Sequence, residues 1–318
     1  MQRFDGGEDC AIGGAEMNHG IAMRRAAAIA WVMVLGIMLA PAPSLAEGTA
    51  EQAGPPASAA PPPKAAVPPY TPPQRTAPPR SAAGDEANYE HCMSLTKSDP
   101  GGARDLAEHW QSHGGAHPAD HCYAVALVEL KQYKEGATRL EALAQAMVHA
   151  PNSLRAEVLD QAAQAWLLAG DPSRAYAADS AALNLLPNDP DLLIDRAEAA
   201  GSEGWYDKAV ADLDRVVKSD PNRADALIYR ASANRELGQL DLALADINRA
   251  LGLAPNSVSA LLERGDILRL NGDVNGARKD WVRVSELAPG SAADAAAKTN
   301  IERLELKEDA AAPTGGKQ

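Results

Sequence analysis

Two cysteines and a run of histidines carry the most specific chemistry in this sequence. Cys92 and Cys122 each follow a histidine, and they are the only cysteines beyond an N-terminal segment that we expect to be removed on export. An even pair of cysteines in an exported chain indicates a disulfide bond. Closing this 30-residue loop would contribute roughly 3 kcal/mol by restricting the unfolded chain. The sequence therefore predicts a disulfide between Cys92 and Cys122.

The histidines offer an alternative interpretation, a zinc site. Four of them recur at intervals of four residues: His109, His113, His117 and His121. Histidine and cysteine side chains together can ligate zinc. However, glycines at 114 and 115 and a proline at 118 interrupt any single helix that would align the four. An oxidising compartment also favours a disulfide over two thiolate ligands. We therefore expect no metal and no other cofactor.

Patterns that indicate catalysis or nucleic-acid binding are missing from the sequence. No histidine follows His149, and there is neither a glycine-rich phosphate loop nor a nucleophile elbow. Carboxylates are numerous but are spread along amphipathic segments. The net charge of −13 argues against binding to phosphate backbones or to anionic lipid. We expect a protein that is not an enzyme and has no nucleic-acid partner.

The first 46 residues have the features of a secretory signal peptide preceded by an extension. Arg24 and Arg25 precede an apolar run over residues 26–40, and small residues at 44 and 46 form a cleavage site before Glu47. The 15-residue run is shorter than the roughly 20 residues that span a bilayer, so a permanent anchor is the weaker alternative. We expect export to the periplasm or the medium, with no membrane span after the signal is removed. Met17 and Met23 are alternative starts.

Residues 47–84 predict a linker. Five proline pairs or triplets lie among alanine, serine and threonine, a composition that cannot bury a core. A semi-extended tether is therefore expected before the folded part.

The rest of the chain is organised by a pattern that returns every 34 residues. Glycines recur at 204, 238 and 272, alanines at 209, 243 and 277, and prolines at 187, 221, 255 and 289. Within one period, residues 191–203 and 206–219 each have apolar spacing of three and four, which predicts two helices. Gly204 lies where a helix ends in a left-handed residue, and Pro221 ends the second helix. One such hairpin cannot bury its apolar faces alone, so neighbouring hairpins must stack.

These positions resemble the tetratricopeptide repeat family. The best unit carries the signature at Ala197, Gly204, Tyr206, Ala209, Leu213 and Pro221. The resemblance implies an all-α fold, a right-handed superhelical solenoid of helix-turn-helix hairpins. It covers residues 119–291 as about five units, of which the last three are regular. We expect a degenerate helical cap over 85–118, a polar capping helix over 292–307 and a disordered tail over 308–318.

An arginine and an aspartate also recur with the period: Arg196 with Asp212, Arg230 with Asp246, and Arg264 with Asp280. Recurrence in every unit favours a structural role, in which the arginine on the first helix pairs with the aspartate on the second. A charged strip for a partner is the alternative.

The resemblance also implies a function, protein–protein interaction through a concave groove lined by the first helices. The family's groove positions fall on Asp160, Gln164, Ile194, Glu198, Ile228, Ser232, Arg235, Leu262, Asp266 and Arg269. Arg235 and Arg269 could hold an acidic group of a partner. We expect a scaffold or adaptor for a protein or peptide of the cell envelope. Self-assembly of the chain into a structural homo-oligomer is the alternative, and an envelope enzyme or metal-binding protein is the less favoured one.

Overall fold

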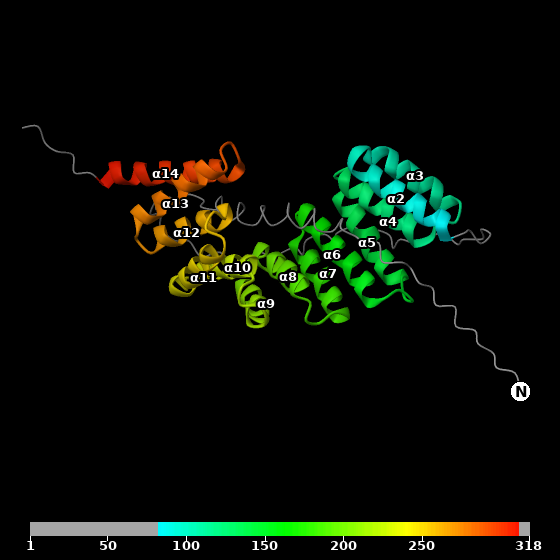
Figure 1. Cartoon of the computed structure of the whole chain (residues 1–318), viewed down its shortest axis with the longest axis horizontal. Helices are drawn as coiled ribbons and strands as arrows, with labels where there is room; N and C mark the ends of the chain where they lie inside the picture. Colours follow the sequence, from blue (N-terminus) through cyan, green and yellow to red (C-terminus); the bar gives the residue numbers. More distant parts are fainter. Residues whose placement is uncertain (1–81, 312–318) are drawn as a thin grey trace, which may run out of the picture.

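The computed structural model describes residues 82–311, and in this part every regular element is an α-helix (Figure 1). The helices are α2 (Ala82–Ser98), α3 (Pro100–Ser112), α4 (Ala116–Glu129), α5 (Tyr133–Ala146), α6 (Asn152–Leu168), α7 (Pro172–Leu185), α8 (Pro190–Ser202), α9 (Tyr206–Ser219), α10 (Ala224–Glu236), α11 (Leu240–Leu253), α12 (Val258–Leu270), α13 (Val274–Leu287) and α14 (Ala292–Ala311). The predicted signal peptide, nearly all of the linker and most of the tail lie outside the described residues. No helix within that part is both long enough and apolar enough to cross a membrane.

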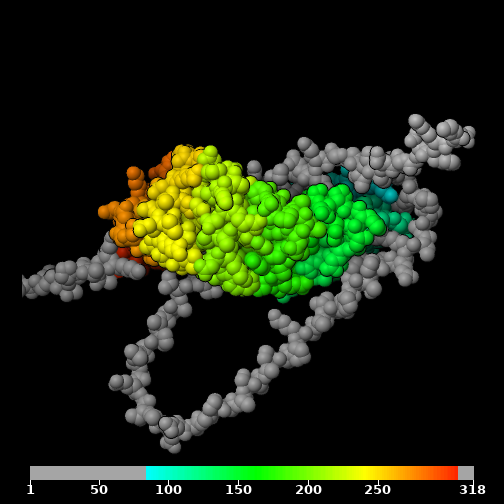
Figure 2. All heavy atoms as spheres, turned by 90° about the horizontal axis from the view of Figure 1, so that it is seen from below, coloured from blue at the N-terminus to red at the C-terminus, as the bar shows by residue number. Residues whose placement is uncertain are grey.

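The helices form hairpins that stack in sequence order, so the predicted all-α solenoid is confirmed. Each helix packs mainly on the one before and the one after it. Figure 2 shows the result as an elongated body whose colour changes in sequence order from green to orange. Successive first helices, such as α8, α10 and α12, also touch one another, whereas successive second helices make little contact. The first helices therefore line the inner side of the stack.

Left-handed residues between the helices produce the hairpins. Gly204 has φ +78° and follows α8, and the matching glycines of the regular units have similar angles. Only glycine adopts this conformation without steric cost. In the turn between α4 and α5 the left-handed residue is Lys131, with φ +62°. The sequence shows no glycine there, which is one reason why this unit matches the repeat pattern less well.

In the last hairpin, a large buried residue on one helix faces a glycine on the other. Where earlier units have Ala231 or Ala197, α12 has Gly265, and the indole of Trp281 on α13 occupies the space that a Cβ would need. Trp281 is fully buried. A close-packed interior accepts a large residue only where its neighbour becomes smaller. Helix α14 then covers this end, burying Ala297 and Leu304 while most of its charged residues face outward.

The recurring arginines hold three helices each, so the predicted Arg–Asp pairing is confirmed. Arg196, Arg230 and Arg264 each donate two hydrogen bonds of 2.6 to 2.8 Å to the two carboxylate oxygens of the predicted aspartate. The remaining guanidinium nitrogen reaches the second helix of the preceding hairpin. It contacts Ser180, Asp214 and Asn248, respectively. Each arginine therefore joins the two helices of its own hairpin to its neighbour.

A second series of arginines ties each hairpin to the turn before it. Arg215, Arg249 and Arg283 on α9, α11 and α13 donate to Asn188, Asn222 and Asn256, at 3.1, 3.5 and 3.2 Å. These arginines are exposed. Their contribution to stability is therefore smaller than that of the buried bidentate pairs.

We predict that Arg264→Met lowers the free energy of unfolding by about 3 kcal/mol, because it leaves the buried Asp280 carboxylate without its main partner. Urea unfolding followed by circular dichroism measures this loss. In a double-mutant cycle with Asp280→Asn, the two single effects should overlap by at least about 1 kcal/mol. The control Arg283→Met removes an exposed arginine of the same hairpin and should cost about 0.5 kcal/mol or less. Strict additivity of the Arg264 and Asp280 changes would contradict the pairing.

Candidate binding site on the first helices

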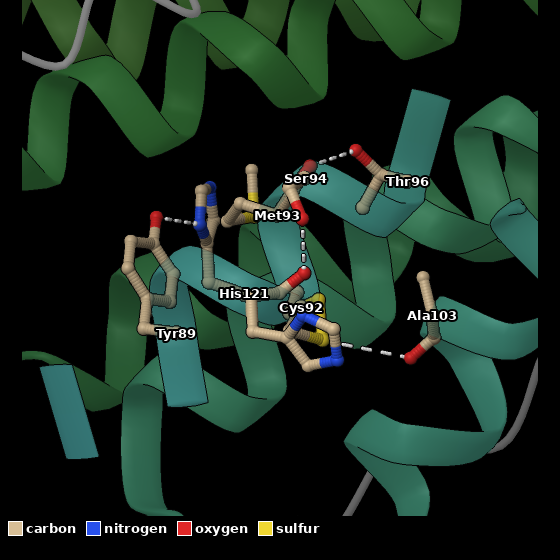
Figure 3. The surroundings of a disulfide bond; sticks show 9 residues. Tyr89, Cys92, Met93, Ser94, Thr96, Ala103 and His121 are labelled. Carbon is tan, nitrogen blue, oxygen red and sulfur yellow. Dashed lines mark hydrogen bonds between the residues drawn. A yellow bond between two sulfur atoms is a disulfide. The ribbon is translucent and has the colours of Figure 1, made fainter. Parts of the chain in front are cut away.

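The two cysteines form a disulfide that joins α2 to α4 (Figure 3). The Cα atoms of Cys92 and Cys122 are 6.2 Å apart, and both residues are fully buried beside Ala107 of α3. These three helices form a small core of their own at the N-terminal end of the stack. The disulfide thus closes the end of the array where the repeat pattern is least regular.

His121 connects this end to the array through both ring nitrogens. The Tyr89 hydroxyl lies 2.7 Å from Nδ1, and Gln161 Oε1 of α6 lies 2.6 Å from Nε2. Burial lowers the pKa of His121, so the ring is neutral. A neutral imidazole accepts at one nitrogen and donates at the other, which matches a hydroxyl donor and an amide oxygen acceptor. The role of His121 here is to position helices.

The other histidines of the four-residue series are exposed and do not converge with His121. His109 and His113 stack on each other with ring centroids 4.1 Å apart, and His117 lies near Asp120. Among the described residues, no group of three or more His, Cys, Asp or Glu side chains is placed to hold a metal ion.

The structure brings the ten predicted groove residues onto the inner side of the stack. They lie on the first helices α6, α8, α10 and α12. Seven of them are almost completely buried: Asp160, Gln164, Ile194, Glu198, Ile228, Ser232 and Leu262. The inner face therefore exposes little of these side chains, and polar contacts such as that of Tyr229 with Glu198 lie where neighbouring first helices meet.

The expectation that Arg235 is free to hold an acidic partner is wrong. Its guanidinium donates to Glu263 Oε1 at 2.6 Å and to Glu236 Oε1 at 2.5 Å, and only 10% of the side chain is exposed. Arg235 and Arg269 both lie close enough to Asp266 to lower the pKa of its carboxyl. Arg235 thus pairs with carboxylates of the protein itself, because a buried charge requires a partner. Burial still raises the pKa of Asp266 to about 7.

A second group of polar residues lies between α6, α8 and α10. Gln164 donates to Asp160 Oδ2 at 3.0 Å, and the Tyr229 hydroxyl donates to Glu198 Oε2 at 3.2 Å. Burial raises the pKa of Glu198, the Tyr229 hydrogen bond lowers it and the charge of Asp160 raises it, giving about 7. No lysine or arginine of the described residues contributes to this shift.

The side-chain oxygen of Gln164 in this group has no hydrogen-bond partner among residues 82–311. Gln164 Oε1 is buried and unsatisfied, while the amide nitrogen of the same side chain is used by Asp160. We call Asp160, Gln164, Glu198 and Tyr229 the acceptor cluster. It presents carboxylate and amide oxygens, to two of which the Tyr229 hydroxyl and the Gln164 amide donate.

Sequence reasoning missed Tyr229 and Glu263, which complete the two groups. Each stands one residue after a predicted groove position, Ile228 and Leu262, and each is buried. The signal was available, because a tyrosine and a glutamate stand at matching positions of two first helices that otherwise bury mainly small and aliphatic residues. Their partners come from the neighbouring unit, about 30 residues away.

We predict that Glu198→Gln removes a pH-dependent loss of stability. The folded protein binds this proton more tightly than the unfolded chain between pH 4.5 and about 7, so the free energy of unfolding falls as pH rises through that window. Above pH 8 the variant should be more stable than the parent by roughly 3 kcal/mol, and below pH 4 the two should be equal. Urea unfolding at pH 4, 6 and 8 measures the difference. A difference that does not change with pH would contradict the buried, protonated carboxyl.

The chain is similar in structure to several solved proteins. Residues 41 to the end of MamA from Desulfovibrio magneticus RS-1 are 21% identical, covering 55% of this chain and 97% of that one, with a TM-score of 0.48. TTC0263 from Thermus thermophilus, described as a thermophilic TPR protein, is 19% identical over 60% of this chain and 100% of its own, with a TM-score of 0.48. YrrB, described as a TPR protein with an unusual peptide-binding site, is 14% identical over 60% and 96%, with a TM-score of 0.45. No curated protein sequence matches the chain.

A family model described as tetratricopeptide repeat matches residues 194–258 and 235–292. These matches begin in α8 and end at the start of α14, so they cover the hairpins in which the 34-residue period is strictest. The helical hairpins and the left-handed glycines agree with this match, which identifies residues 194–292 as tetratricopeptide repeats.

Proposed function

We propose that the chain is an exported adaptor that binds an extended segment of another envelope protein along its first helices. The observation that carries this proposal is the acceptor cluster. Gln164 Oε1 is buried without a donor from the described residues, and the Glu198 carboxyl is buried with a hydrogen bond from Tyr229 alone identified. A stack needed only for its shape would be more stable with apolar residues at these positions. A partner that supplies the missing donors would account for them.

The inner side of the stack runs across several first helices, as the binding of an extended peptide requires. Ile194, Ile228 and Leu262 stand at matching positions of α8, α10 and α12 and form an apolar row beside the polar residues, almost completely buried in the free chain. Solenoids use such continuous inner surfaces for extended ligands. A row of aliphatic contacts with polar groups at intervals can read an extended segment.

We predict that peptides selected from a random displayed library with the purified protein bind along the inner side. Hydrogen exchange should show protection in α6, α8, α10 and α12 on binding, with little change in α7, α9, α11 and α13. Light scattering should show a monomer with and without peptide. Failure to select any peptide, or protection confined to second helices, would overturn the adaptor proposal. A stable oligomer would favour self-assembly instead.

We propose further that the chain is exported. The apolar run over residues 26–40 and the small residues at 44 and 46 support this, and so does the buried disulfide, because such bonds persist in oxidising compartments. The intact mass of the protein recovered from a secreting host should correspond to a chain beginning at Glu47 and lighter by two hydrogens. A chain that keeps residues 1–46 in a cytosolic fraction would contradict export.

A further inference from the structure

Two exposed histidines at the end of α3 are close enough to share a metal ion. His109 and His113 are four residues apart, and their ring centroids are 4.1 Å apart with the ring planes tilted by 36°. Zinc binds imidazole nitrogen at about 2.0 to 2.1 Å, so two nitrogens on one ion are separated by at most about 4.2 Å. Histidines four residues apart lie on the same side of a helix and form zinc sites in other proteins. The pair therefore has the separation that two ligands of one ion require.

A hydrogen bond fixes the position of one proton on the His113 ring. Nδ1 of His113 lies 2.8 Å from the carbonyl oxygen of His109 and 2.9 Å from the Ser112 hydroxyl. A carbonyl oxygen only accepts hydrogen bonds, so Nδ1 carries the proton. The lone pair of the neutral ring is then on Nε2. Histidines that bind metals commonly donate their other N–H to a carbonyl oxygen in this way.

The two rings are also free to turn toward an ion. Both side chains are exposed, and Nε2 of His113 has no hydrogen bond or ion pair with the described residues. The same holds for the ring nitrogens of His109. The opposite face of α3 buries Ala103, Ala107 and Trp110, so a rotation of either imidazole leaves the core unchanged. The net charge of −13 favours the approach of a cation.

The other two histidines of the four-residue series do not join this pair. Gly114 and Gly115 follow α3, so His117 belongs to α4, where it lies near Asp120. His121 is buried and uses both ring nitrogens within the protein. The four histidines therefore do not form one site, and the remaining candidate is a site of two.

We propose that His109 and His113 together bind a divalent transition metal ion, Cu²⁺ most tightly and Zn²⁺ less tightly. Imidazole is a ligand of both ions, and Cu²⁺ forms the strongest complexes among the divalent first-row metals. Two protein ligands leave the other coordination positions to water or to a group of another molecule. The ion joins the last turn of α3 to the residue that follows the helix, while Ala107 on the other face packs beside the disulfide. This site is independent of the proposed function.

The first test uses the full-length protein, purified without an affinity tag and stripped of metal by a chelator. Calorimetric titration with CuCl₂ should show a site that His109→Ala and His113→Ala each weaken at least about tenfold. Zn²⁺ should compete for this site, and Mg²⁺ should not. His117→Ala and His149→Ala remove exposed histidines outside the pair and should bind Cu²⁺ as the parent does. Equal binding by the parent and the two pair variants would overturn the proposal.

A second set of variants tests the spacing while the number of histidines stays constant. In the His113→Ala background, Asp105→His places a histidine four residues before His109 on the exposed side of α3 and should restore Cu²⁺ binding. Glu108→His in the same background adds a histidine next to His109, where the two side chains do not face each other, and should not restore it. Recovery by both variants, or by neither, would contradict a site that depends on the spacing. Circular dichroism melting checks that each variant is folded.

Hydrogen exchange tests whether the ion is held by the folded end of α3. Cu²⁺ should slow amide exchange at this end of the helix in the parent, because a ligand of the folded state stabilises that state. It should have no such effect in His113→Ala. Protection elsewhere in the chain with none at the end of α3 would place the ion at a different site and overturn the proposal.

Discussion

The stack depends on one repeated interaction, the bidentate bond between a first-helix arginine and a second-helix aspartate. Burying these charges is favourable only because each arginine donates well-aligned hydrogen bonds to both oxygens of its aspartate. Each guanidinium uses its planar fork on the aspartate and its remaining nitrogen on the hairpin before, as Arg230 does with Asp246 and Asp214. The bond therefore fixes the angle within a hairpin and the position of the next one together. The placing of successive first helices along the inner side follows from this bond.

Most of the fold could be predicted from the sequence because it is set by local rules that repeat. Left-handed glycines such as Gly204 and helix-ending prolines such as Pro221 act within a few residues. The irregular first unit was harder to predict because Lys131 adopts the left-handed conformation without being a glycine. The third contact of each arginine was also missed, because its acceptors differ in type although their places match: Ser180, Asp214 and Asn248.

The positions of the candidate site residues could be predicted from the sequence, but their partners and their burial could not. The family register placed Glu198 and Arg235 on the inner face, and both lie there. It could not show that Arg235 is held by Glu263, since that partner comes from the next unit and the pairing depends on burial. Nor could it show that Glu198 lies beside Asp160 and shares a buried hydrogen bond with Tyr229. In a repeat protein, the partner of a buried charge can come from the neighbouring unit and has to be sought there.

Buried carboxyls near α12 and near α8 differ in how their charge is compensated. Near α12, carboxylates and arginines of the chain neutralise one another, which stabilises the stack and leaves little for a ligand to add. Near α8, Leu167 and Gly201 replace the arginines, and Glu198 remains buried with a pKa of about 7. A carboxyl in that condition reduces stability at neutral pH, because its charged form is poorly solvated. The two carboxyls therefore affect the stability of the stack differently, although they occupy matching positions of the repeat.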